Sequence, residues 1–252
     1  MASGPTLSSL WQSAPPSRAR LAPELLADHP PPVRWLLAHA LPLGRPLPTA
    51  VWLTMHGEIK LNRWWPFTAE QVIVQGRGMI WEARVHMAGL PIRGWDRLVD
   101  GRGALRWSLF GLLPFLRAAN ADVTRSARGR ARAESVWLPT LWLDPTLRWR
   151  PKAEGRLRVC LPPLDQPEGD PEKLEFELGP SGQIRAVTLS RWGQPGGGPY
   201  REEPFGALVE AERTFDGVTL PSRLRVGWWP GTPRFEREGE FFRCEVTAAR
   251  FR

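Results

Sequence analysis

His56 and Glu58 are the residues whose types and spacing come closest to acid–base or metal-binding chemistry. They lie two positions apart in a stretch with strand-like alternation, so both side chains point to one face of that strand. His86 lies on the polar face of a second such stretch. Imidazole and carboxylate groups that converge can transfer protons or bind zinc. Solvated His and Glu are nevertheless the usual occupants of a polar strand face, and we favour that interpretation.

The motifs of the common enzymatic reactions are absent from the sequence. The Gly-x-Gly stretches at 76–78 and 101–103 lack the third glycine of a dinucleotide-binding loop, and no Walker A, Gly-x-Ser-x-Gly or His-Glu-x-x-His string occurs. Cys160 and Cys244 lie far apart without zinc-ligand spacing, which predicts free, buried thiols. We therefore expect neither a metal nor a cofactor.

The basic excess of the chain does not predict a nucleic-acid partner. The formal charge is +8, but the basic residues are scattered from Arg18 to Arg252. A nucleic-acid binder would concentrate them on one stripe or helix, where each neutralised phosphate adds to affinity. The densest cluster, Arg125 to Arg132, could meet phosphates or anionic headgroups along one helical face. Because it lacks aromatic or leucine anchors, we favour a solvated face.

Tryptophan is the most unusual component of the chain. Each of the 14 rings in 252 residues can bury roughly 150–250 Å². On the concave face of a curled sheet they would either line a ligand cavity or fill an oversized core, and both interpretations are open. If the tryptophans line a ligand cavity, the lining residues would be Trp81, Trp107, Trp137 and Trp142.

A sheet must position these side chains, because most of the chain has the two-residue period of strands. The alternation is clear in Val51–Leu61 and Met79–Met87. Eight further stretches have strand character: Gly94–Val99, Ala104–Phe110, Leu157–Leu161, Leu174–Leu178, Ile184–Trp192, Leu208–Phe215, Val218–Trp228 and Glu240–Phe251. Short turns between most of them predict an antiparallel meander, and a sheet of about ten strands must curl. The predicted fold is therefore mainly β with a minor helical part, a large curved antiparallel sheet or half-barrel.

One helical segment interrupts this pattern. From Asn120 to Trp137 apolar residues recur at helical spacing, with Asn120 or Asp122 as N-cap and Pro139 as a stop. Apolar stretches flank the segment on both sides. A helix within a meander would lie across the sheet, so we predict a helical lid over the concave face at about residues 120–143.

The remaining features predict one domain. Residues 1–32, rich in turn formers, are expected to form a loosely ordered arm that leads into a short helix near Val33–Ala40. Residues 33–252 would then be a single half-barrel domain. No run of about 18 apolar residues is present, and Met1–Leu21 lacks the apolar run of a secretory signal. We therefore expect a cytoplasmic protein without a membrane span.

Several strings between about Val33 and Arg252 resemble a bacterial family known only as a domain of unknown function. They are Met55–Leu61, Pro66–Gln71, Ala133–Thr140, Arg191–Gly193, Pro204–Gly206, Val226–Thr232 and Gly239–Arg243. That family is similar to the lipoprotein-localisation carriers, whose curved antiparallel half-barrel holds acyl chains under a helical lid. The resemblance implies the same fold and a hydrophobic ligand, but no catalytic residues.

The resemblance also implies a set of candidate site residues, the polar positions that recur in the family. They are Glu58, Arg63, Glu70, Gln71, Glu134, Arg191, Glu240 and Arg243. Each of them could equally fix a turn or form a salt bridge of the lid.

Three functional hypotheses follow. The first is a non-enzymatic binder of a lipid-like or other hydrophobic small molecule in a cavity under the lid. The second is an enzyme that holds a hydrophobic substrate in the same cavity, with Glu58 or Glu134 as acid or base. The third is a structural or partner-binding module with a filled core. Peripheral contact with a membrane surface is compatible with all three, and the oligomeric state is open.

Overall fold

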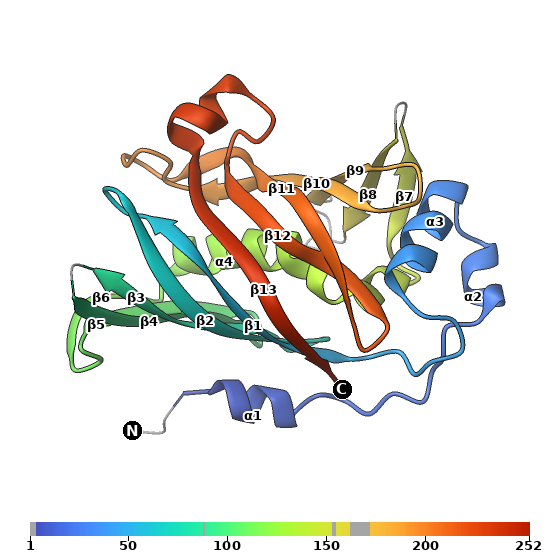
Figure 1. Cartoon of the computed structure of the whole chain (residues 1–252), viewed down its shortest axis with the longest axis horizontal. Helices are drawn as coiled ribbons and strands as arrows, with labels where there is room; N and C mark the ends of the chain where they lie inside the picture. Colours follow the sequence, from blue (N-terminus) through green and yellow to red (C-terminus); the bar gives the residue numbers. More distant parts are fainter. Residues whose placement is uncertain (1–3, 88, 153–154, 162–171) are drawn as a thin grey trace.

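The computed structural model describes residues 4–87, 89–152, 155–161 and 172–252, and one sheet of 13 strands dominates it (Figure 1). The strands are β1 (Ala50–Lys60), β2 (Trp64–Val74), β3 (Gly78–Met87), β4 (Leu90–Val99), β5 (Arg102–Leu109), β6 (Leu113–Ala118), β7 (Arg148–Pro151), β8 (Arg156–Leu161), β9 (Glu172–Leu178), β10 (Ile184–Gly193), β11 (Arg201–Phe215), β12 (Val218–Trp228) and β13 (Glu240–Phe251). The ten stretches predicted as strands lie within ten of these, apart from Leu61 and Phe110 at two strand ends. Sequence reasoning missed β2, β6 and β7.

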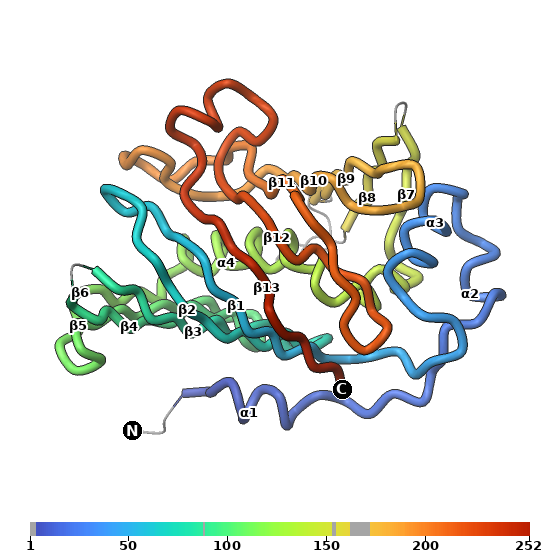
Figure 2. Tube along the Cα trace, viewed as in Figure 1, coloured from blue at the N-terminus to red at the C-terminus, as the bar shows by residue number. Residues whose placement is uncertain are grey.

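The sheet is antiparallel throughout and joins the two ends of the chain at its centre. Its order is β6-β5-β4-β3-β2-β1-β13-β12-β11-β10-β9-β8-β7. Each half is therefore a meander of neighbouring hairpins, and the pairing of β1 with β13 connects the halves. Strands β6 and β7 are the two edges, so the sheet curves without closing (Figures 1 and 2). This confirms the predicted half-barrel.

Helix α4 (Ala121–Ala133) lies inside the curve and forms the predicted lid (Figure 1). Asn120 is its N-cap and accepts a 2.9 Å hydrogen bond from the backbone N–H of Val123. The helix contacts β10 on one side and β4 and β5 on the other, so it spans the concave face between the two halves. Two 3-10 turns, η1 (Glu134–Trp137) and η2 (Pro139–Leu143), continue the lid toward β7.

Two apolar clusters hold the sheet, one on each face. The larger lies on the concave face, beneath the lid and helix α3 (Pro31–Ala40), which contains the predicted helix at 33–40. The smaller lies on the convex face, where Leu7 and Leu10 of helix α1 (Leu7–Gln12) pack over Val72, Val74 and other strand residues. No helix in the described part of the chain is both long and apolar enough to cross a membrane.

The N-terminal segment is more ordered than the sequence analysis expected for residues 1–32. Of this segment, residues 4–32 are described, and they include α1, α2 (Pro23–Ala27) and the start of α3. Thr6 caps α1 in a capping box with Ser9, and Leu10 is only 2% exposed. A capped turn with two apolar side chains docks because it covers an apolar patch of the sheet that would otherwise face water. The C-terminal Arg252 lies beside this segment and donates a hydrogen bond to the carbonyl of Trp11 (Figure 2).

Candidate functional site

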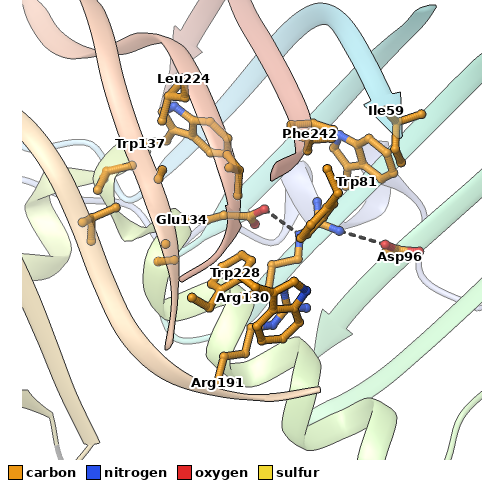
Figure 3. A pocket seen from close by; sticks show the side chains of 18 of the residues that line it. Ile59, Trp81, Asp96, Arg130, Glu134, Trp137, Arg191, Leu224, Trp228 and Phe242 are labelled. Carbon is orange, nitrogen blue, oxygen red and sulfur yellow. Dashed lines mark hydrogen bonds and ion pairs between the residues drawn. The ribbon is translucent and has the colours of Figure 1, made fainter. Parts of the chain in front are cut away.

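A cavity of about 240 Å³ lies between the concave face and the lid (Figure 3). Its wall is mainly aromatic and aliphatic, and its charged residues come from α4, η1, β4 and β10. The lining residues are Ile59, Trp81, Asp96, Trp107, Arg130, Ala133, Glu134, Val136, Trp137, Val187, Arg191, Phe205, Gly206, Ala207, Leu224, Val226, Trp228, Phe241 and Phe242.

Arg130 is the centre of a charged cluster on one wall of this cavity. Its Nε donates to Glu134 Oε1 at 2.6 Å, one helical turn away, and its Nη1 donates to Asp96 Oδ2 at 2.8 Å (Figure 3). Gln71 donates from Nε2 to the second oxygen of Glu134 at 2.6 Å. Burial opposes the charge on Arg130, but the two carboxylates outweigh it and raise the pKa of the guanidinium. The cluster therefore ties the lid to β2 and β4.

Arg191 extends from β10 beneath the lid without such a neutralising partner. Its guanidinium lies 4.4 Å from the ring centre of Phe205 and 5.6 Å from that of Trp228, and it donates to the carbonyl and hydroxyl oxygens of Ser126. Burial, and after it repulsion from Arg130, lowers the pKa of Arg191 to about 10. Among the described residues no carboxylate lies within ion-pair distance of it.

The aromatic wall is a chain of ring contacts. Trp81 packs against Phe67, Trp107 and Phe242, with ring centres 5.9, 5.9 and 6.0 Å apart. Two indoles of the cavity wall use their N–H groups inside the protein: Trp107 donates to Asp96 and Trp137 to the carbonyl of Pro221. The indole N–H of Trp81 is buried and has no hydrogen-bond partner within the described structure.

The structure brings five of the twelve predicted site residues to the cavity wall: Trp81, Trp107, Trp137, Glu134 and Arg191. Gln71 lies behind the wall, fully buried, and reaches it through its hydrogen bond to Glu134.

Trp142 does not line this cavity but a second one of about 340 Å³, between the lid and strands β2 and β3. It is 2% exposed, packs edge-on against Phe176 at 5.1 Å, and donates its indole N–H to Ser135. The reason is the break in the lid at Leu138, whose non-helical backbone separates η1 from η2. Residues beyond this break face the β7–β9 end of the core and not the first cavity.

Glu58 and Glu70 lie on the opposite, convex face, because they occupy the alternate positions of β1 and β2. Glu70 accepts a hydrogen bond from the indole N–H of Trp52 and stands directly opposite Glu82. Burial, with the nearby charge of Glu70, raises the pKa of Glu82. Glu58 is half exposed and lies 3.8 Å from a nitrogen of Arg243. Neither Glu58 nor Glu70 can touch a molecule in the cavity.

Glu240 and Arg243 form a separate ionic cluster with Arg225 at the start of β13. Both oxygens of Glu240 accept hydrogen bonds from both arginines, at 2.6 to 3.1 Å. Burial would raise the pKa of Glu240, but these hydrogen bonds and charges lower it to about 2. Arg63 lies in the β1–β2 turn with its guanidinium 4.1 Å from the ring centre of Trp65. These residues fix turns and strand ends outside the cavity.

His56 and His86 do not converge with Glu58 on a metal site. His56 lies opposite Thr68 of β2, while His86 lies opposite Pro91 of β4. Within the described residues no group of three or more His, Cys, Asp and Glu side chains could hold a metal ion.

Sequence reasoning missed part of the cavity wall: Asp96, Arg130, Phe205, Trp228 and Phe242. The Arg130 to Glu134 spacing of one helical turn was a usable signal for the ion pair. No such signal existed for Asp96, because Asp96 on β4 and Arg130 on α4 are 34 residues apart in the chain and meet only in the folded protein.

A family model for DUF6544 matches residues 19–236, which is most of the chain. The chain belongs to this family of unknown function. The match confirms the resemblance to an uncharacterised family that the sequence strings indicated. No curated protein sequence matches this DUF6544 chain significantly.

This DUF6544 chain is also distantly similar to solved structures. A LolA superfamily protein from Nitrosomonas europaea has 8% identity and a TM-score of 0.44, over 88% of this chain and 92% of that chain. A domain from Vibrio parahaemolyticus, assigned to outer membrane lipoprotein sorting, has 10% identity and a TM-score of 0.44, over 81% and 85%. A DUF1329 family protein from Desulfovibrio piger has 10% identity and a TM-score of 0.37, over 81% and 86%.

Proposed function

We propose that the protein binds a small amphipathic molecule in the cavity beneath the lid, with the apolar part against the tryptophans and an anionic head group at Arg191. The proposal is one of non-enzymatic binding. It is carried by a single observation, the partly buried guanidinium of Arg191 in an aromatic cavity without an ion-paired carboxylate among the described residues.

The energetics of burial support an anionic head group. A buried cation that lacks a counter-charge loses solvation without regaining it from an ion pair. The hydrogen bonds to Ser126, the ring faces of Phe205 and Trp228 and the more distant charges of Glu134 and Asp96 compensate this cost only in part, since the pKa of Arg191 is still lowered. A carboxylate or phosphate placed at Arg191 would supply the missing charge, and bidentate hydrogen bonding is the geometry that arginine favours.

The size of the cavity limits the ligand. At about 240 Å³ it is somewhat smaller than common ligand pockets, which measure roughly 300–1,000 Å³. The proposed ligand is therefore either small or only partly enclosed, with one end outside the cavity.

The enzymatic alternative has less support. Glu58 lies on the convex face, so its predicted role as acid or base in the cavity is wrong. Glu134 does line the cavity, but both of its oxygens already accept hydrogen bonds, from Arg130 and Gln71. Its position indicates that it holds the lid in place rather than transfers protons.

Binding can be tested with a pair of probes that differ only in the head group. Binding of each probe is followed by quenching or shift of the tryptophan fluorescence. Octanoate should bind at a concentration at least about tenfold lower than octanol does, because one charge-assisted contact contributes about that factor to affinity. In the Arg191→Met variant this preference should disappear, while octanol binds as before.

The matched control is Arg125→Met. Arg125 also lies over a tryptophan, at 4.0 Å from the ring centre of Trp192, but outside the cavity. It should leave the preference for octanoate unchanged. If the wild-type protein binds neither probe, and native mass spectrometry of protein from its own host shows the bare polypeptide mass, the filled-core, partner-binding hypothesis replaces this one.

A further inference from the structure

Three hairpin turns lie together at one end of the sheet, in the half formed by β1 to β6. The turns follow Lys60, Met87 and Leu109, and the registers of the three hairpins place them at the same end of consecutive strands. Neighbouring turns are two strands apart, or about 10 Å. They form the left-hand end of the sheet in Figure 1.

These three turns and the edge strand β6 carry most of the exposed large apolar side chains of the described structure. Seven of the ten lie here: Leu61, Leu90, Phe110, Leu112, Leu113, Phe115 and Leu116. Leu112 is 79% exposed and Phe115 is 61% exposed. Large apolar side chains gathered on one exposed surface mark an interaction site, because scattered single ones are the norm for a soluble surface.

The residues nearest these turns are basic and not acidic. The hairpin segments 59–69, 83–95 and 103–121 contain Lys60, Arg63, Arg84, Arg93, Arg106 and Arg117 but no Asp or Glu, whereas Glu58, Glu70 and Glu82 lie farther along the strands. Trp64 and Trp65 lie beside the first turn, each with a guanidinium over its ring. At a membrane surface, apolar side chains enter the lipid while arginines and tryptophans lie at the level of the headgroups. The side chains at this end of the sheet have the same arrangement.

The shape of the edge strand favours a bilayer over a protein partner. Every residue of β6 from Leu113 to Arg117 is exposed, so both faces of this strand are uncovered. A partner protein would cover one face, whereas lipid surrounds an inserted tip on both. Pairing of two copies through β6 would also bring together arginines, since Arg117 already stands opposite Arg106.

We propose that this end of the sheet, formed by the β1–β2 and β5–β6 turns, Leu90 at the start of β4, and β6, docks on the surface of an anionic lipid bilayer. The apolar tips enter the headgroup region, and the arginines meet lipid phosphates. The cavity reaches the same end of the molecule, because its lining residue Ile59 is two residues from Leu61 and its lining residue Trp107 pairs with Leu116 across β5 and β6. Docking would therefore place the cavity beside the membrane, but it does not depend on what the cavity binds.

Co-sedimentation of the full chain with vesicles tests the proposal. The protein should bind vesicles of phosphatidylcholine that contain about 30% phosphatidylglycerol, and bind them less at about 0.5 M than at about 0.05 M NaCl. The double variant Leu112→Ser with Phe115→Ser should bind at least about tenfold more weakly. Arg106→Gln with Arg117→Gln should bind neutral and anionic vesicles equally. Because all four side chains are exposed or at the edge, each variant should keep the wild-type circular dichroism spectrum.

A matched control lies far from this end. Trp35 and Leu43 are 57% and 59% exposed but belong to the α3 region, so Trp35→Ser with Leu43→Ser should bind vesicles like the wild type. Equal binding of the Leu112 and Phe115 variant and the wild type would overturn the proposal. So would a wild-type oligomer that does not bind vesicles and that this variant converts to a monomer, since the surface would then contact a second copy. Octanoate binding by the same variant should stay at the wild-type level, which separates this test from that of the cavity.

Discussion

At the scale of single residues, the protein buries charge in two different ways. Glu240 is surrounded by arginines that donate to both of its oxygens, so its charge is neutralised within the fold. Arg191 is surrounded by rings and by Ser126, so its charge is solvated only in part. The first arrangement is typical of a structural ion pair, whereas the second leaves a charge for a ligand to complete.

The ionic cluster of Glu240 predicts a specific dependence of stability on pH. Its pKa in the folded protein is about 2, below the ordinary 4.5, so its ionised form is favoured by folding. The resulting stabilisation is complete above about pH 5 and is lost as the pH falls toward 2. In Glu240→Gln the free energy of unfolding should be lower by on the order of 2 kcal/mol at neutral pH, and should fall less between pH 5 and 2.

Urea unfolding at a series of pH values measures this difference. Glu245→Gln, an exposed carboxylate on the same strand, is the control and should follow the wild-type curve. Parallel curves for Glu240→Gln and the wild type below pH 5 would mean that Glu240 has an ordinary pKa.

At the scale of elements, the short helix α1 is held to the convex face by very few side chains. Leu10 is 2% exposed beneath it, so Leu10→Ala should lower the free energy of unfolding by about 2 kcal/mol or more. Ser8→Ala, on the exposed side of the same helix, should cost much less. If the two variants unfold at the same urea concentration, α1 does not contribute to stability, and the loosely ordered arm expected from the sequence would be the better description in solution.

The lid lies so close to β5 that only glycine fits at position 103. A Cβ there would lie 2.5 Å from the Cα of Thr124 in α4. Gly103→Ala should therefore push the start of α4 away from the sheet, destabilise the protein by about 1–3 kcal/mol and weaken octanoate binding. The control is Gly4→Ala, whose Cβ would meet only the flexible end of Arg97. An unchanged affinity in Gly103→Ala would show that the lid position does not shape the cavity.

Elements with a single buried face were predictable from the sequence, and those with two were not. Strand β1 alternates from Leu53 onward because only its concave side is covered there, and α4 shows its N-cap and helical period directly. In β2 the last four residues are all buried, because α1 covers the convex side there, so the alternation disappears. Strand β6 was assigned to an apolar loop because it is exposed on both faces and has no buried side to set a pattern.

The residues of the candidate site could also be predicted only in part from the sequence. Tryptophan content and the lid position led to four tryptophans as cavity residues, and three of these line the cavity. The polar residues taken from the family resemblance divided between the two faces of the sheet, as alternate positions must. Pairs made by tertiary folding, such as Asp96 with Arg130, leave no local trace in the sequence.

At the scale of the whole molecule, three parts of the one sheet have different roles. The concave face and lid enclose the proposed ligand, the convex face carries α1, and one end presents apolar tips among arginines. The proposed cavity and the proposed membrane surface meet at that end. A lipid-like ligand could then pass between bilayer and cavity without crossing water, provided that both proposals hold.

The pairing of β1 with β13 also has a consequence for how the protein is made. Strand β1 ends at Lys60 and its partner begins at Glu240, about 180 residues later in the chain. On a ribosome that adds roughly 5–20 residues per second, the backbone edge of β1 would stay unpaired for roughly 10–40 s. During that time the nascent chain exposes a strand edge next to an apolar face, which is a site for faulty pairing with other chains. Chaperone protection during synthesis is therefore expected to matter more for this protein than its finished fold would suggest.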